Sequence, residues 1–371
     1  MRTEKLLVVF VFLGVMYSCS SDENNSNGDN TNQNPGFEYF ASSSNYFWKD
    51  FVTLCNAEEL YDTGLPVTDL YGFAVSGNDI YQGAEARFRT VYSGNDHYLN
   101  FGGCVLKNNT ILYSDTGEGT AVRYVAVKGS DVYYLSMHMS EVTGQPVAPK
   151  LWKNGVMQYE LIGPYNGNWS TANPWTFDLC VVGTDVYVGG WQSNGGSSFT
   201  TQCGYWKNGN FIQVTYGQDP AVFAKSKLKV TENGDVYFMT GFSVGGLRYQ
   251  SKIFKNGVEF PITYEGVRSV FFDFDISGTD LYIVGTDIDE SNNSTKTIWK
   301  NGTPIYFSFP ENNYEEMTKI SISDNRVFTG SYSSYNMTIW ELNPAAGSLA
   351  KVGSKSEPYG VGLTQLYVRK K

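Results

Sequence analysis

The chain has 371 residues, of which 41% are hydrophobic and 16% aromatic, and its formal net charge is −10 at pH 7. This acidity excludes a protein that binds nucleic-acid backbones nonspecifically, because such binding needs concentrated Lys and Arg. The chain has two histidines, His97 and His138, which leave little material for a His-based metal site or a Ser-His-Asp triad.

Residues 1–18 have the pattern of an export signal peptide. Arg2 and Lys5 flank the start of an apolar run that ends at Met16 and is too short to cross a bilayer as a permanent helix. Cys19 follows the small residue Ser18, as in bacterial lipoprotein signals. The resemblance implies that Cys19 is lipidated and becomes the mature N-terminus.

Residues 19–36 have the composition of a disordered tether, because Asn, Ser, Gly and Asp dominate and almost nothing apolar is available for burial. The run Ser20-Ser21-Asp22-Glu23 resembles the surface-export signal of Bacteroidetes-type lipoproteins. This resemblance implies a lipid anchor in the outer membrane or at the cell surface, and it leaves open the periplasmic or extracellular side. The alternative is a plain secretory signal, with Cys19 incidental.

Two short phrases alternate along the rest of the chain. The first is Gly-x-Asp-aliphatic-Tyr, with five clear copies at residues 77–81, 129–133, 183–187, 233–237 and 278–282, and weaker copies at Val327-Phe328 and Leu366-Tyr367. The fourth copy has Asn in place of the first Gly. The second is apolar-Trp-Lys-Asn-Gly, with copies or degraded copies at residues 47–51, 105–109, 151–155, 205–209, 253–257, 298–302 and 339–343. The spacing of about 48 residues is typical of a propeller blade.

Apolar residues around the first phrase have the period of two of β-strands, and we name the strands of each repeat A, B, C and D. Strand A precedes the first phrase, strand B contains it, and strand C ends in the second phrase. The Asn-Gly pair that follows predicts a tight hairpin to strand D. Each repeat is therefore predicted to be a four-stranded antiparallel meander, with small residues in strand A near an axis.

The phrases resemble those of bacterial β-propeller lipoproteins, and residues 230–237 look like the general bacterial β-propeller repeat. We predict an all-β fold, a seven-bladed β-propeller over residues 37–371 whose last blade is closed by strands from both ends of the chain. Strands A and B of that blade are predicted at residues 359–368, and strands C and D at residues 46–54. A six-bladed ring with an appended hairpin is the structural alternative.

In such a meander the A–B and C–D turns share one face, here called the tight-turn face. The B–C and D–A connections share the opposite, long-loop face, where binding is expected because loops vary on a rigid scaffold. Aromatic side chains beside amides suit sugar recognition there. The candidate residues are Tyr98, Trp169, Trp175, Trp191, Tyr216, Tyr249 and Tyr332. The alternative is that these rings pack the loops onto the blades.

The axis offers a second candidate site. Six charged residues fall in the strand A columns that face the axis, where they could line a central channel with alternating sign: Asp178, Lys227, Lys229, Asp273, Asp275 and Lys319. Structural pairing explains opposite charges close together without a ligand. A ligand site stays the alternative.

Other chemistry is weakly indicated. Asp287, Asp289 and Glu290 offer oxygen ligands of the kind calcium takes, but they lack the Gly and bidentate Glu of a helix-loop-helix calcium site, and a solvated acidic loop is the competing interpretation. The spacings of Cys55, Cys104, Cys180 and Cys203 match no zinc pattern. We expect buried free thiols, with Cys55–Cys104 as the bridge that the spacing leaves open.

These observations predict a lipid-anchored, noncatalytic binding protein that recognises a glycan on the long-loop face, with no cofactor. The alternatives are a protein-interaction scaffold in a cell-envelope complex and a polysaccharide-active enzyme. No sialidase-type Ser-x-Asp-x-Gly-x-x-Trp box occurs. Glycosidase chemistry needs two carboxylates at a defined separation. Glu85, Asp96, Glu141, Asp219, Glu265 and Asp287 are possible, and the sequence selects no pair. A monomer is favoured, and the membrane is contacted through the lipid only.

Overall fold

A computed structural model describes most of the chain from Gly36 onward. The described residues are 36–43, 46–50, 52–56, 60, 67–93, 96–115, 120–139, 146–162, 175–193, 201–217, 226–243, 249–306, 316–332, 336–356 and 363–371. The proposed signal peptide, Cys19 and the proposed tether up to residue 35 lie outside these ranges. In the part of the chain that the structure describes, no helix is long and apolar enough to cross a membrane.

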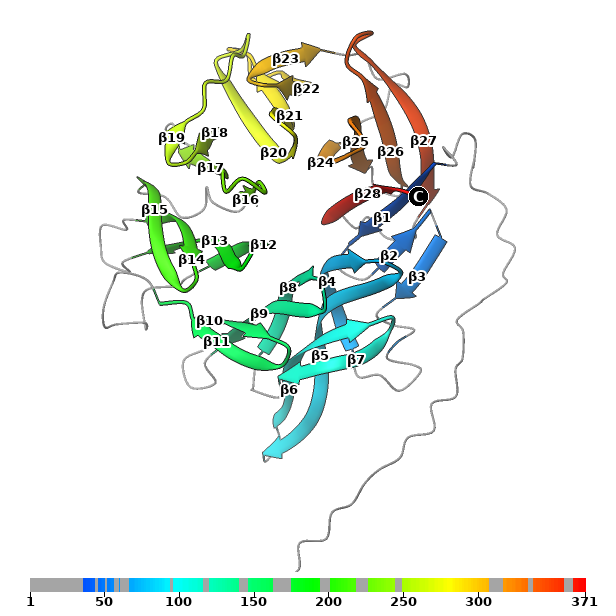
Figure 1. The fold of residues 1–371 in the computed structure, drawn as a ribbon, viewed down its shortest axis with the longest axis vertical. Coiled ribbons are helices and arrows are strands. Elements are labelled where there is room, and N and C mark those ends of the chain that lie inside the picture. Colours follow the sequence, from blue (N-terminus) through cyan, green and yellow to red (C-terminus); the bar gives the residue numbers. More distant parts are fainter. Residues whose placement is uncertain are drawn as a thin grey trace, which may run out of the picture.

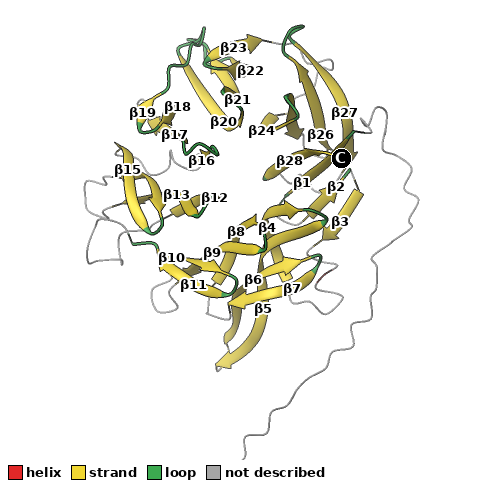
Figure 2. Cartoon of the chain, viewed as in Figure 1, coloured by secondary structure: helices red, strands yellow, loops and turns green. Residues whose placement is uncertain are grey.

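The described residues form seven four-stranded antiparallel sheets, and Figure 2 shows strands joined by turns and loops throughout. Blades one to three consist of β4 (Val67–Ser76), β5 (Asp79–Ser93), β6 (Asp96–Lys107), β7 (Thr110–Asp115), β8 (Thr120–Lys128), β9 (Asp131–Met139), β10 (Pro146–Lys153), β11 (Val156–Glu160), β12 (Trp175–Val182), β13 (Asp185–Ser193), β14 (Thr201–Lys207) and β15 (Asn210–Gly217).

Blades four to six have the same order. They consist of β16 (Lys227–Val230), β17 (Val236–Ser243), β18 (Tyr249–Lys255), β19 (Val258–Glu259), β20 (Arg268–Ser277), β21 (Asp280–Ile288), β22 (Ser294–Lys300), β23 (Thr303–Tyr306), β24 (Glu316–Ser323), β25 (Arg326–Tyr332), β26 (Asn336–Asn343) and β27 (Ser348–Ser356). Blade seven combines β28 (Gln365–Lys370) with β1 (Phe37–Ser42), β2 (Tyr46–Lys49) and β3 (Val52–Asn56).

The seven sheets are arranged as blades around a common axis, with the first strand of each blade innermost (Figure 1). Neighbouring inner strands contact each other, as in β4 with β8 and β24 with β28. The predicted seven-bladed propeller is confirmed, and the six-bladed alternative is wrong.

The seventh blade closes differently from the prediction. Only its inner strand, β28, comes from the C-terminal end, because β1 pairs with it as strand B, with Tyr39 opposite Val368 and Phe40 opposite Tyr367. The prediction that residues 359–368 supply both A and B is therefore wrong. The seventh copy of Asp-aliphatic-Tyr is Glu38-Tyr39-Phe40, whose Phe40 lies opposite Lys49 as Tyr187 lies opposite Lys207 in blade three.

The two repeated phrases meet at the tight-turn face in an Asp–Lys–Asn network. In blade three the Lys207 ammonium lies 2.7 Å from a carboxylate oxygen of Asp185 and 5.2 Å from the centre of the Tyr187 ring. Asn208 donates to Asp185, and its Oδ1 accepts from the backbone N–H of Val186, both at 2.8 Å. Blades one, two, four and five repeat these contacts. The side chains therefore recur because they join strand B to the C–D turn.

Blades six and seven keep this network with different residues. In blade six Arg326 occupies the Asp position and Glu341 the Lys position, and the two form an ion pair with the charges exchanged. In blade seven Glu38 pairs with Lys49 at 2.6 Å. There Asp50, with φ of 49°, replaces the turn Asn and accepts from the Tyr39 backbone N–H. An exchanged pair is expected when the interaction, rather than the identity of either residue, is what the blade requires.

The core lies between blades and is dominated by aromatic side chains. Trp206, Trp299 and Trp340 from the second phrase are fully buried. The indole N–H of Trp299 donates to the Thr263 carbonyl at 2.9 Å, so its burial leaves no unpaired donor. These contacts confirm that the second phrase is scaffold.

Free thiols are confirmed at Cys104, Cys180 and Cys203. Cys104 is buried and free, so the bridge to Cys55 that the spacing left open does not form. Cys180 and Cys203 lie on β12 and β14 with β13 between them. Cys180 is only half-buried, because it faces the axis.

Candidate functional site

The first two strands of each blade carry three successive layers of residues, which we name from the long-loop face downward. The long-loop layer comprises the cross-strand pairs four residues after the Tyr position of strand B. The upper axial layer is Gly72, Tyr124, Asp178, Lys227, Asp273, Lys319 and Gln365. The lower axial layer is Ala74, Ala126, Cys180, Lys229, Asp275, Ser321 and Tyr367, each opposite the Tyr position of its blade. In blade seven this position is held by Tyr367, opposite Phe40.

Four of the six predicted axial charges form two ion pairs between β16 and β20. Lys227 pairs with Asp273 and Lys229 pairs with Asp275, the second at 2.8 Å. Burial alone raises the pKa of Asp275, but the Lys229 and Lys227 ammonium groups outweigh it and hold that pKa below its usual value. Pairing between neighbouring blades therefore accounts for these four charges.

The axial carboxylates also tie blade three to blade four and blade five to blade six through backbone hydrogen bonds. Asp273 accepts from the Ile320 N–H at 3.1 Å, and Asp275 accepts from the Ile322 N–H at 2.9 Å. Asp178 accepts from Leu179 at 2.9 Å and from Leu228, on the next blade, at 3.2 Å. Because burial is the largest influence on Asp178, its pKa lies above the usual value despite the nearby lysines.

Lys319 differs from the other two axial lysines. Its ammonium makes no hydrogen bond or ion pair with any residue in the described ranges, although it belongs to the same layer as Lys227. Burial lowers the pKa of Lys319, and the attraction of Asp273 and Asp178 offsets this effect only in part. The side chain keeps partial exposure, so water reaches it.

The long-loop layer of blade one brings together two carboxylates that the sequence did not pair. Asp69 on β4 lies directly opposite Glu85 on β5, next to two irregularities in the register. Like charges in this position destabilise a sheet. Burial, followed by the repulsion of Asp69, raises the pKa of Glu85, although a 3.0 Å hydrogen bond from the Tyr71 hydroxyl acts in the opposite direction.

Arg123 of blade two lies beside this carboxylate pair. Its guanidinium is 5.3 Å from the centre of the Tyr71 ring, and its Nε is buried with no hydrogen-bond partner among the described residues. Its positive charge lowers the pKa of Glu85, as one of the weaker influences. Asp69, Tyr71 and Arg123 were not predicted from the sequence, because the strand irregularities move Asp69 out of the register that the Asp79 turn predicts.

Equivalent positions in other blades hold candidate residues of a different kind. Trp191 lies opposite Trp175 in blade three, and Tyr332 lies opposite Glu316 in blade six. Trp191 and Tyr332 are half-buried and pack against the hydrophobic clusters of their blades. The same layer thus carries carboxylates, indoles and a phenol where the lower layers carry the scaffold.

The remaining aromatic candidates are dispersed. Tyr98 lies on β6 opposite Val91, in a long hairpin rather than a loop, and Tyr216 lies on β15 opposite Gln202. Tyr249 begins β18, and its carbonyl accepts from Arg268 at 3.2 Å. Trp169 lies outside the described residues. The structure therefore does not gather Tyr98, Tyr216 and Tyr249 at one place.

The acidic segment proposed for calcium uses its oxygens for backbone contacts. Asp287 is buried on β21 and accepts from the backbone N–H groups of Glu265 and Gly266 at 2.7 and 3.0 Å. Asp289 accepts twice from Asn293, and Glu290 follows it in the turn. Within the described ranges, no group of three or more His, Cys, Asp or Glu residues is arranged to hold a metal ion.

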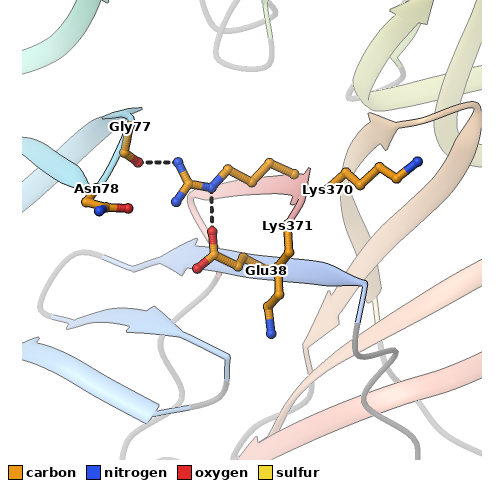
Figure 3. A pocket seen from close by; sticks show the side chains of 6 residues that line it. Glu38, Gly77, Asn78, Lys370 and Lys371 are labelled. Atoms are coloured by element: carbon orange, nitrogen blue, oxygen red, sulfur yellow. Dashed lines mark hydrogen bonds and ion pairs between the residues drawn. The ribbon is translucent and has the colours of Figure 1, made fainter.

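A shallow depression of about 400 Å³ lies on the opposite, tight-turn side, where blade seven meets blade one (Figure 3). Arg369 crosses it, donating to Glu38 at 2.5 Å and to the Gly77 carbonyl. Lys370 pairs with Asp324 at 2.7 Å. These contacts close the ring, and we assign the depression to ring closure rather than to ligand binding.

No protein-family model and no curated protein matches the sequence. Solved structures match the fold at low identity. Two prolyl endopeptidases share 13% identity at a TM-score of 0.50, over 88% of this chain and 49% of theirs. Apo AztD from Citrobacter koseri shares 9% identity at a TM-score of 0.37, over 90% of this chain and 98% of the AztD chain. The β-propeller domain of the Trilobed protease from Pyrococcus furiosus shares 9% identity at a TM-score of 0.45, over 80% of this chain and 93% of that domain's chain.

The seven four-stranded sheets define the class of the protein as a seven-bladed β-propeller, and the similarities concern the fold alone. The chain spans about half the length of the prolyl endopeptidases that it matches, 49%. The matched proteins include peptidases and proteins of other kinds, so the fold does not select an activity.

Proposed function

We propose that the protein is a noncatalytic binding module that recognises a carbohydrate at the long-loop end of the axis. The observation that carries the proposal is the long-loop layer, in which the repeat stops and blade-specific pairs replace it. Half-buried aromatic rings at Trp191 and Tyr332 offer faces for the C–H surface of a sugar. Asp69 and Glu85 offer acceptors for its hydroxyl groups.

The test is a glycan screen followed by calorimetry on single variants. Trp191→Ala and Glu85→Gln are expected to weaken binding at least tenfold, because each removes a group from the long-loop layer. Lys128→Met, at the exposed tight-turn end of β8, is a control that leaves binding unchanged. Absence of binding to every glycan, or unchanged affinity in both variants, would refute the proposal.

A second candidate function is hydrolysis of a polysaccharide, favoured by the Asp69–Glu85 pair alone. Two carboxyl groups at one place, one of them with a raised pKa, are the kind of arrangement that general acid and base catalysis uses. Turnover of a bound glycan that disappears in Glu85→Gln while binding persists would replace the noncatalytic proposal. Binding without turnover would retain it. A protein-interaction scaffold is the remaining alternative, which a reproducible crosslinked partner would favour.

We also propose that Cys19 carries the lipid that holds the propeller at the outer membrane or cell surface through residues 19–36. The Ser18-Cys19 junction and the following Ser-Asp-Glu run support it. Metabolic labelling with a fatty acid is expected to mark the protein, and Cys19→Ser is expected to abolish the label and release the protein from membranes. A labelled Cys19→Ser variant would contradict this assignment.

A further inference from the structure

Among the three axial lysines, Lys319 is the one whose ammonium has no acceptor within the described residues. Lys227 and Lys229 each bond a carboxylate of the neighbouring blade, whereas the Lys319 ammonium contacts no acceptor within the described residues. Its side chain is partly exposed, so water solvates the ammonium in the free protein, and the group is available to a ligand that enters the axis.

The neighbouring acceptors are already occupied. Asp273 accepts from Lys227 and Phe274 through one oxygen and from Ile320 through the other. Asp178 accepts two backbone N–H groups through its two oxygens. Because these bonds join strands of neighbouring blades, turning either carboxylate toward Lys319 would break a contact of the ring.

The opposite side of the same layer has no charged side chain. Gln365 bonds both backbone groups of Phe73 through its amide, at 2.8 and 3.1 Å. Gly72 has no side chain, and a Cβ there would lie 2.8 Å from the Arg123 carbonyl. Tyr124 follows, and its hydroxyl makes no hydrogen bond to a described residue. Around the ring, β24, β28, β4 and β8 succeed one another (Figure 1).

Two side-chain donors of the upper axial layer, the Lys319 ammonium on β24 and the Tyr124 hydroxyl on β8, make no hydrogen bond to a described residue, and Gln365 and Gly72 stand between them in the ring. The six axial charges sum to zero, since three lysines face three aspartates. Asp178 and Asp273 lie close enough to influence Lys319, so a doubly charged anion would be repelled there. A single carboxylate fits the charge of one free ammonium.

The sector is also continuous with the long-loop layer. Lys319 follows Glu316 by three positions on β24, which corresponds to about 10 Å along a strand. We propose that Lys319 and Tyr124 bind the carboxylate of an acidic sugar, a uronic acid, whose ring is held at the long-loop layer. This inference rests on the proposed carbohydrate function and names its substrate class.

The experiment compares uronic-acid oligosaccharides with neutral oligosaccharides of equal length, and with acetate, by calorimetry. The uronic-acid ligands are expected to bind at least tenfold more tightly than the neutral ones. Lys319→Met is expected to remove that preference and Lys319→Arg to retain part of it. Lys128→Met is the charge-matched control, expected to keep it. Thermal midpoints of all variants show that each is folded.

Each other outcome overturns the inference. Equal affinity for acidic and neutral ligands would leave carbohydrate recognition standing and remove the role of Lys319. Acetate binding as tightly as the sugars would show a carboxylate site without sugar recognition. A preference that survives Lys319→Met would place the carboxylate elsewhere. Failure of every sugar to bind would refute the proposed function together with the inference.

A second measurement follows Lys319 directly in case Lys319→Met fails to fold. Reductive methylation with ¹³C labels the lysines of the intact protein, and Lys319→Arg identifies the Lys319 signal. The pKa of Lys319, lowered in the free protein by burial, is expected to rise when a uronic-acid ligand binds. A pKa that does not change at saturating ligand would exclude contact with the carboxylate.

Discussion

The two ends of the same strands follow different rules. At the tight-turn face, strand B begins with Asp and Tyr in blades one to five, and each blade repeats one hydrogen-bonded network. Four residues further along strand B, the equivalent residues are Glu85, Met137, Trp191, Gly241, Thr286 and Tyr332. The ring therefore constrains one end of its blades and leaves the other end free to differ.

The charged residues at the axis combine the features of the two ends. Lys227, Asp273 and Asp275 differ from the residues of other blades, as binding residues would, yet they bond neighbouring strands as scaffold residues do. A departure from the repeat is thus not sufficient evidence for binding. What distinguishes Lys319 is the absence of an acceptor among the described residues, rather than its charge.

The largest expected effect comes from removing the strand that both ends share. Deletion of residues 365–371 removes β28, its six-residue pairing with β1 and the Gln365 bonds to blade one. Ring closure is lost and two sheet edges are exposed. We expect loss of cooperative thermal unfolding, measured by circular dichroism. Gln365→Ala, which removes only the side-chain bonds, is the control and is expected to retain a cooperative transition. A truncated protein with an unchanged midpoint would contradict closure through β28.

A smaller effect is expected from breaking one axial pair. Lys227→Met leaves the buried Asp273 without its cation and is expected to cost roughly 3 kcal/mol of unfolding free energy. Asp273→Asn in the Lys227→Met background is expected to recover part of that loss, because it removes the unpaired charge. Chemical denaturation of the two single variants and the double variant measures the coupling. Additive losses would show that the pair is not a unit.

Much of the scaffold was predictable, because the repeated residues make their contacts within one blade. The Asn-Gly turns were predicted from their need for positive φ, and the structure has Asn154 and Gly155 at 51° and 79°. Ring closure was predicted, but the strands of blade seven were divided wrongly between the two ends of the chain. Leu366-Tyr367 resembles the strand B phrase, whereas Glu38-Tyr39-Phe40 occupies strand B in the structure. The ion pair of Glu38 with Lys49 identifies the true copy, and only the fold reveals this contact.

The candidate site was less predictable, for physical reasons that differ between residues. The six axial charges were found because they occupy repeat columns, but their partners depend on which neighbouring blade each side chain reaches. Asp69 could not be paired with Glu85 from the sequence, since two irregularities between β4 and β5 shift the register. Extending the upper axial column by its period would have found Tyr124 but not Gln365, because the sequence assigned Leu366-Tyr367 to strand B of blade seven.

The exchanged ion pair of blade six offers a sharper test of the tight-turn face. Glu341→Lys places a second positive charge beside Arg326 and is expected to cost about 1 kcal/mol. The further change Arg326→Asp restores the Asp–Lys arrangement of blades one to five and is expected to recover the loss. Urea denaturation measures both steps. If less than half of the lost unfolding free energy is recovered, the orientation of the pair matters, and the exchange has a role beyond pairing.

The smallest effect per residue is expected from titrating the tight-turn network. Hydrogen bonds from Lys, followed by those from Asn, lower the pKa values of Asp79, Asp131, Asp185, Asp235 and Asp280. A carboxyl group whose pKa is lower in the folded than in the unfolded state contributes stability above its ordinary pKa. That stability is lost as the pH falls through the lowered values, below the ordinary Asp value of about 3.9.

Thermal midpoints are therefore expected to fall between pH 5 and pH 2, and Asp185→Asn is expected to reduce the dependence. High salt is expected to weaken the effect, because these carboxylates are solvent-exposed and screened. Glu85→Gln supplies the contrast from the long-loop end. The pKa of Glu85 is raised, so ionisation destabilises the folded state and its removal is expected to stabilise the protein above about pH 5. If the thermal midpoint changes with pH by the same slope in Asp185→Asn and in the unmodified protein, the repeated network does not titrate with folding. The two ends of the blades would then differ in sequence alone.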